Sequence, residues 1–230
     1  MKKFALFLLA LALMPLCWAV VMATPGLFSM VPRTQGGLFS AEVLALWAGL
    51  GLFLAMWLMR FRPVKTYVFA HEMTHAIVGL FFGARPSNLK VTMKGGSVQL
   101  TKSNVWITLA PYFIPFYTVL LVLVAAIVRL SLHRLPCPPA WTFAVGFTWC
   151  FHMCFTLKSL GEEQPDVKEY GRLFSWILIF LLNAAGILVW VTVTTDLGYA
   201  DLWNSLWNRM SSAYLATWNF MVNLLHRLGV

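Results

Sequence analysis

Long apolar runs dominate the pattern of this chain, and short polar segments separate them. A helix needs roughly 20 apolar residues to cross the hydrocarbon core of a bilayer. Six runs have about this length: Phe4–Ala23, Ala41–Trp57, Thr66–Phe82, Val105–Leu130, Ala140–Leu160 and Leu173–Val193. Because no water satisfies backbone groups inside a bilayer, we predict that each run forms a helix.

Two prolines, Pro111 and Pro115, interrupt the fourth run. Proline lacks a backbone N–H, so each one removes a helical hydrogen bond and frees the carbonyl of an earlier residue. We therefore expect the helix to bend or open there. Such a break either lines a cavity within the membrane or is a simple packing kink.

The spacing of apolar and polar residues changes after the third run. From Leu89 to Thr101, apolar and polar residues alternate around the pair Gly95-Gly96. Alternation indicates strands, and the glycines suit a turn that needs positive φ, so we predict a short β-hairpin with its turn at Gly-Gly. An exposed strand edge there could hold an extended peptide by strand addition, and a plain surface hairpin is the alternative.

The tail beyond Asp201 carries apolar residues at helical spacing opposite a polar face. This pattern is typical of an amphipathic helix lying in the membrane interface. The fold class that we expect is an all-α polytopic membrane protein, with about six transmembrane helices and one hairpin. Residues 1–195 would form the membrane domain and residues 196–230 the interfacial helix.

Composition agrees with a membrane protein. The chain is 60% hydrophobic and 11% charged, with a mean hydropathy of +0.76, which excludes an ordinary soluble domain. Lys2-Lys3 and the run Phe4–Ala23 could form a signal peptide. That run exceeds the usual apolar core of about 7–15 residues, so we favour an uncleaved first helix. We expect an integral protein of the bacterial cytoplasmic membrane.

The net charge of +9 first suggests nucleic acid. The basic residues are scattered through short loops between apolar runs, which is how membrane proteins carry them. Nucleic-acid binding is therefore not expected. Lys and Arg divide almost equally between the two predicted membrane faces, so the orientation stays open.

The sequence His71-Glu72-Met73-Thr74-His75 matches H-E-x-x-H and lies within the run Thr66–Phe82. Residues four apart share a helix face, so the two imidazoles could hold one Zn²⁺. Glu72 would then take a proton from water bound to the metal. These polar groups cost several kcal/mol in a membrane unless they are paired, liganded or wetted. The alternative is a pair of hydrogen-bonded core histidines.

A catalytic zinc needs a third protein ligand and an open position. Of the other histidines, only His152 lies well inside an apolar run, whereas His133 and His226 stand beside arginines at the ends of segments. Glu162, Glu163, Asp166 and Glu169 follow the fifth run. The residues alone leave the choice between His152 and these acids open.

The chain resembles the site-2-protease-like intramembrane zinc metalloproteases over residues 65–176. The features that carry the resemblance are the His71–His75 motif in an apolar helix, the Gly-Gly hairpin, Ala110-Pro111, and Gln164-Pro165-Asp166. The resemblance implies Asp166 as the third ligand, with His152 as the alternative. Val167 follows Asp166 where the family has glycine, and the family's inserted peptide-binding domain is missing. Reaching a metal on the third run requires the chain after Leu160 to turn back.

These features predict an intramembrane zinc metalloprotease that cleaves membrane-embedded or membrane-proximal peptides, with Glu72 as general base. The second hypothesis is a non-catalytic membrane scaffold or assembly protein derived from such a protease. A metal transporter needs several acids or histidines along a path, and the chain has one cluster only.

Overall fold

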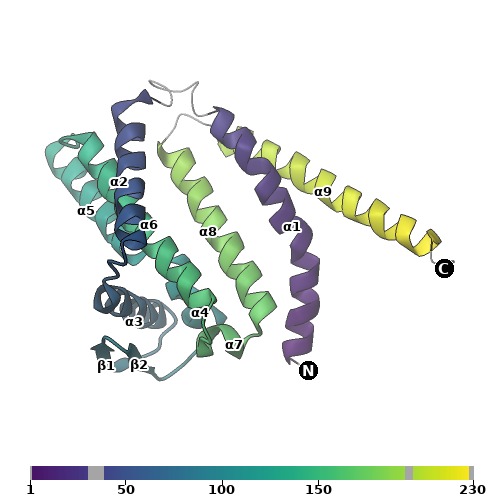
Figure 1. Cartoon of the computed structure of the whole chain (residues 1–230), viewed down its shortest axis with the longest axis horizontal. Helices are drawn as coiled ribbons and strands as arrows, with labels where there is room; N and C mark the ends of the chain where they lie inside the picture. Colours follow the sequence, from purple (N-terminus) through teal and green to yellow (C-terminus); the bar gives the residue numbers. More distant parts are fainter. Residues whose placement is uncertain (1, 31–38, 195–198, 228–230) are drawn as a thin grey trace. The chain divides into compact units, whose positions relative to one another are not determined.

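The computed structural model of the chain describes residues 2–30, 39–194 and 199–227, which form helices and one two-stranded sheet (Figure 1). The chain forms two compact units. One is Phe39–Glu169, and the other combines Met1–Leu38 with Tyr170–Val230. Every residue of the predicted site belongs to the unit Phe39–Glu169.

The unit Phe39–Glu169 contains α2 (Ala41–Leu58), α3 (Val64–Phe81), β1 (Pro86–Thr92), β2 (Gly95–Leu100), α4 (Val105–Phe113), α5 (Phe116–Leu132), α6 (Pro138–Leu160) and α7 (Pro165–Glu169). The other unit contains α1 (Lys2–Met30), α8 (Arg172–Thr194) and α9 (Tyr199–Arg227). The predicted C-terminal helix is therefore present as α9. It packs along α1, where Tyr214 Oη donates to the carbonyl of Ala12 at 3.1 Å. Its position in a membrane interface stays a prediction.

Three of the described helices are long and apolar enough to cross a membrane, namely Lys3–Met22, Ala41–Leu58 and Pro138–Leu160. The pair α4 and α5, bent by 77°, makes a fourth if it counts as one broken span. This bend confirms the break predicted from the prolines. The third predicted run forms α3, which is less apolar because it carries the polar motif, and α8 contributes a shorter apolar stretch. A polytopic helical membrane protein is thus supported, and six spans remain a prediction.

Glycines let α2 and α6 approach until their backbones touch. A Cβ added at Gly49 would lie 2.0 Å from the carbonyl oxygen of Phe143, and one at Gly146 would lie 2.3 Å from that of Leu46. Small residues permit this kind of contact between membrane helices. Below the crossing, Phe53 of α2, which is buried, packs edge to face against Phe147 and Phe151 of α6.

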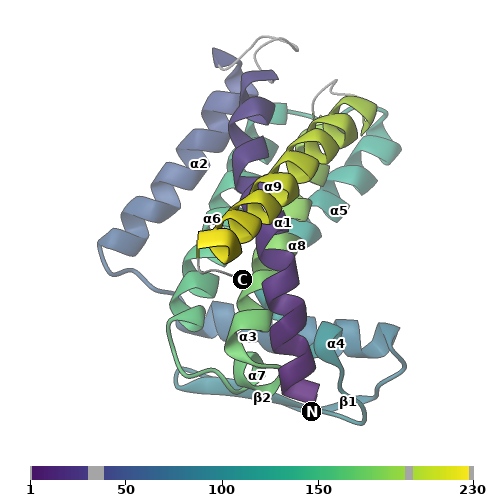
Figure 2. The ribbon, with the colours of Figure 1, turned by 90° about the vertical axis from the view of Figure 1, so that its right-hand side faces the viewer.

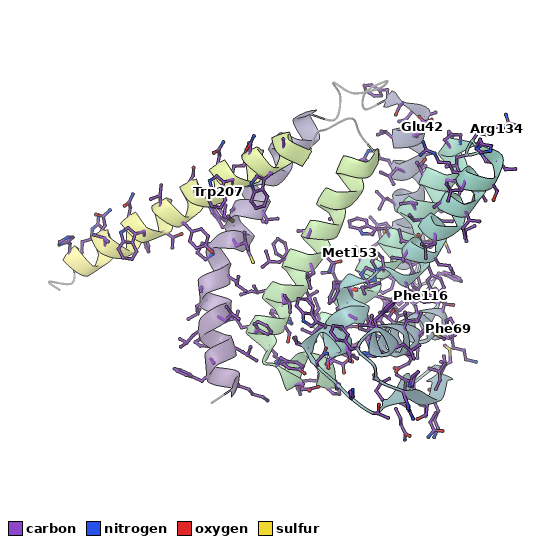
Figure 3. The ribbon with its side chains drawn as sticks, turned by 180° about the vertical axis from the view of Figure 1, so that it is seen from behind. Glu42, Phe69, Phe116, Arg134, Met153 and Trp207 are labelled. Atoms are coloured by element: carbon purple, nitrogen blue, oxygen red, sulfur yellow. The ribbon has the colours of Figure 1, made fainter. Side chains whose placement is uncertain are left out.

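Helix α3, which carries the His71–His75 motif, runs crosswise below α2, and the hairpin lies on its other side (Figures 1 and 2). An edge-to-face contact between Phe69 of α3 and Phe116 of α5, with ring centroids 6.2 Å apart, ties α3 to the bent pair (Figure 3). Helix α3 is therefore held between the hairpin and the helices α4 and α5.

The hairpin forms where it was predicted, but the placement of its turn was wrong. Met93 and Lys94 make the turn, and Gly95 and Gly96 begin β2, opposite Thr92 and Val91. Gly96 serves close packing instead, whereas Gly95 has a φ of 147° and open space around its Cβ position. A Cβ at Gly96 would lie 2.6 Å from Cγ of Glu72 on α3.

Candidate metal centre

Helix α3 and the short helix α7 bring three potential metal ligands together. The Nε2 atoms of His71 and His75 each lie 3.4 Å from the same oxygen, Oδ2 of Asp166. One ligand atom from each residue falls within 4.8 Å of the others, so this group could hold a metal ion. The chain after Leu160 thus turns back, as the role predicted for Asp166 requires.

His75 is oriented by a backbone carbonyl of α4. Its Nδ1 lies 2.8 Å from the oxygen of Ile107. A carbonyl can only accept, so Nδ1 carries the hydrogen and Nε2 presents its lone pair toward Asp166. A second partner that fixes the tautomer in this way is usual for histidines that bind metals.

His71 has an equivalent partner in Tyr67, one helical turn earlier on α3. The Tyr67 hydroxyl lies 3.3 Å from His71 Nδ1 and 2.9 Å from Ser159 Oγ on α6. Its ring stacks on Phe155 with centroids 4.5 Å apart. Tyr67 can accept from Nδ1 while it donates to Ser159, which leaves the lone pair of Nε2 facing Asp166.

Asp166 is held by Tyr112, a wholly buried residue of α4. The Tyr112 hydroxyl donates to Asp166 Oδ2 at 3.1 Å, and its ring meets His71 edge to face at 5.2 Å. Burial raises the pKa of the Asp166 carboxyl, but the neighbouring imidazoles of His71 and His75 lower it more, to well below its usual range. Asp166 is therefore a carboxylate, the form that binds a metal.

The donor set fits a divalent cation. When the imidazoles are neutral and carry their hydrogens on Nδ1, two Nε2 lone pairs and one carboxylate oxygen converge, an arrangement that a metal cation or a proton on Nε2 stabilises. Two imidazole nitrogens and one carboxylate oxygen are ligand types that divalent cations commonly take from proteins.

Glu72, between the two histidines on α3, lies under the hairpin. Its side chain is buried against Gly96, and the backbone of Val98 makes a hydrogen bond with its carboxylate. The hairpin therefore covers the residue that was predicted to be the general base.

The other candidate ligands lie outside the cluster. His152 is buried in α6 and does not belong to the metal-binding group found among the described residues. Glu162 pairs with Lys158 at 3.4 Å, and Glu163 pairs with Lys168. Glu162 and Glu163 are thus engaged with lysines, and Glu169 is outside the metal-binding group found among the described residues.

Four orienting groups were not predicted from the sequence: Tyr67, Ile107, Tyr112 and Ser159. The spacing of Tyr67, four residues before His71, could have indicated a shared face. The others come from α4 and α6, and no local pattern connects them to the motif.

Comparison of the chain with protein-family models, with curated proteins and with solved structures gives no match. We therefore infer the function from the side chains of α3, α4 and α7.

Proposed function

We propose that this chain is an intramembrane zinc metalloprotease of the site-2-protease-like kind. The observation that carries the proposal is the convergence of ligand atoms of His71 and His75 on α3 and of Asp166 on α7 within 4.8 Å, with Glu72 standing between the two histidines in sequence. A pair of packed core histidines would not need a carboxylate oxygen equidistant from both imidazoles. The orienting contacts to all three ligands also support a metal centre.

In the proposed reaction, His71, His75 and Asp166 would hold a zinc ion, and the bound ion would supply Lewis-acid chemistry for the scissile carbonyl and for water. The Glu72 carboxylate accepts a proton from the attacking water as the water oxygen bonds to the carbonyl carbon. Glu72 then gives this proton to the amide nitrogen as the C–N bond breaks, which releases an amine and a carboxylic acid.

The proposed substrate is a membrane-embedded or membrane-proximal peptide in extended form, because the backbone of an intact helix is closed to attack. The sheet contains only β1 and β2 among the described residues, so each strand has one edge without a strand partner. The contact of Gly96 with Glu72 brings the hairpin next to the proposed general base. Strand addition at the hairpin would hold a peptide close to Glu72.

The test compares purified wild-type protein with Glu72→Gln and His75→Ala in detergent. We expect about one zinc per chain in the wild type and in Glu72→Gln, and a loss of zinc in His75→Ala. Cleavage of a panel of single-span membrane peptides should require both residues. Wild-type cleavage by Glu72→Gln would refute the mechanism.

One observation favours a second candidate, a non-catalytic scaffold that keeps the metal. Glu72 is only 7% exposed beneath the hairpin. If the chain is a scaffold, we expect Glu72→Gln to leave its cellular function intact. His75→Ala, which removes the metal, should abolish that function.

A further inference from the structure

The orientation of His75 depends on a carbonyl that an ordinary helix would not leave available. In an α-helix, the N–H of each residue donates to the carbonyl four residues earlier. Pro111 lies inside α4 and has no N–H. The carbonyl that loses its helical donor is therefore that of Ile107.

This same carbonyl accepts the hydrogen bond from His75 Nδ1 at 2.8 Å. Ile107 is 1% exposed, so its carbonyl has little access to solvent. A buried carbonyl without a partner is costly, and the imidazole relieves that cost. The start of α4 is also fixed, because the N–H of Ile107 donates to the Asn104 side chain at 2.9 Å. The free carbonyl is thus held firmly in place.

We propose that Pro111 is a positioning residue for the metal centre. By withholding a backbone donor, it keeps the Ile107 carbonyl available to His75 and so sets the tautomer that presents Nε2. An alanine at position 111 would donate to the same oxygen along the helix axis and compete with the imidazole. The inference rests on the metal-binding part of the proposed function and not on peptide cleavage.

The second proline of the bent pair provides a matched control. Pro115 stands at the break, after α4 has ended at Phe113 and Ile114 has become extended, so it withholds no helical donor from α4, and the carbonyl four residues before it is that of Pro111. That carbonyl is the hydrogen-bond acceptor of neither His71 nor His75. Pro115→Ala therefore changes the same broken span without touching a ligand of the proposed ion.

The first measurement is nitrogen NMR of metal-free protein labelled with ¹⁵N-histidine, in detergent and with the imidazoles neutral. The chain has only 5 histidines, so His75→Gln assigns the signal. We expect His75 to carry its hydrogen on Nδ1 in the wild type and in Pro115→Ala, and to shift toward the Nε2–H form in Pro111→Ala. A wild-type His75 with its hydrogen on Nε2 would overturn the proposal without any variant.

The second measurement is zinc affinity by competition with a chromogenic chelator. Loss of a group that orients a ligand typically lowers metal affinity about 10- to 100-fold, and we expect such a loss in Pro111→Ala alone. Equal losses in both proline variants, or a wild-type tautomer and affinity in Pro111→Ala, would overturn the proposal. A chain that binds zinc as expected but cleaves no peptide refutes the protease and leaves this inference standing.

Discussion

Replacing Tyr112 by phenylalanine removes one oxygen atom and, with it, the hydrogen bond to Asp166 Oδ2 at 3.1 Å. The ring, which is wholly buried and in contact with His71, stays in place. The substitution therefore removes the bond to Asp166 while it keeps the packing of the ring. We expect Tyr112→Phe to fold and to bind zinc more weakly.

The expected loss of zinc affinity follows from the negative charge of the Asp166 carboxylate, which accepts the hydrogen bond. A hydrogen bond to a charged group contributes about 1.5–3 kcal/mol. At about 1.4 kcal/mol per tenfold change in an equilibrium constant, this corresponds to a loss of roughly 10- to 100-fold in zinc affinity. That range agrees with the usual effect of changing a residue that orients a metal ligand.

The assay is chelator competition for zinc, together with the visible absorption of protein loaded with Co²⁺, which reports the geometry of the ligands. Tyr117→Phe is the matched control, because its hydroxyl donates to the carbonyl of Thr66 at 2.9 Å and not to a proposed ligand. We expect wild-type affinity and a wild-type Co²⁺ spectrum for the control. If Tyr112→Phe binds zinc as tightly as the wild type, or if both variants lose affinity equally, Tyr112 does not orient Asp166.

Three further predictions concern the hairpin, the helix crossing and the rejected ligand. Gly96→Val should push the hairpin away from Glu72 and sharply reduce peptide cleavage while zinc content stays at the wild-type level; unchanged cleavage would count against close packing there. Gly146→Leu should separate α2 from α6 and lower stability in thermal unfolding by about 1–3 kcal/mol or more, whereas Gly51→Ala, with open space around its Cβ position, should not destabilise the protein. His152→Gln should keep about one zinc per chain, and its loss would return His152 to the ligand set.

Local patterns predicted the local parts of the site. The pair His71 and His75 shares a helix face by simple periodicity, and the prolines of the fourth run predicted the bend between α4 and α5. Asp166 was identified through a family resemblance. No spacing rule connects it to His71, because the contact depends on how α7 folds back.

The features that the sequence did not reveal depend on contacts between distant segments. Tyr112 meets Asp166 across 54 positions of the chain, and Gly96 meets Glu72 across two elements. The error in the hairpin turn has the same origin. A glycine pair suits a tight turn and a close approach of backbone equally well, and only the position of α3 distinguishes the two.

The ligands of the proposed ion come from two widely separated parts of the chain, since His75 on α3 and Asp166 on α7 lie 166 − 75 = 91 positions apart. An ion bound by residues of both α3 and α7 would therefore cross-link these helices. The chain between them, which is most of the unit Phe39–Glu169, would form one closed loop. By analogy with a disulfide, closing a loop of about 100 residues lowers the conformational entropy of the unfolded chain. This stabilises the folded state by up to roughly 4–5 kcal/mol. The same three side chains would then contribute both to catalysis and to the stability of the unit. Loss of the ion would therefore destabilise the fold as well as abolish activity.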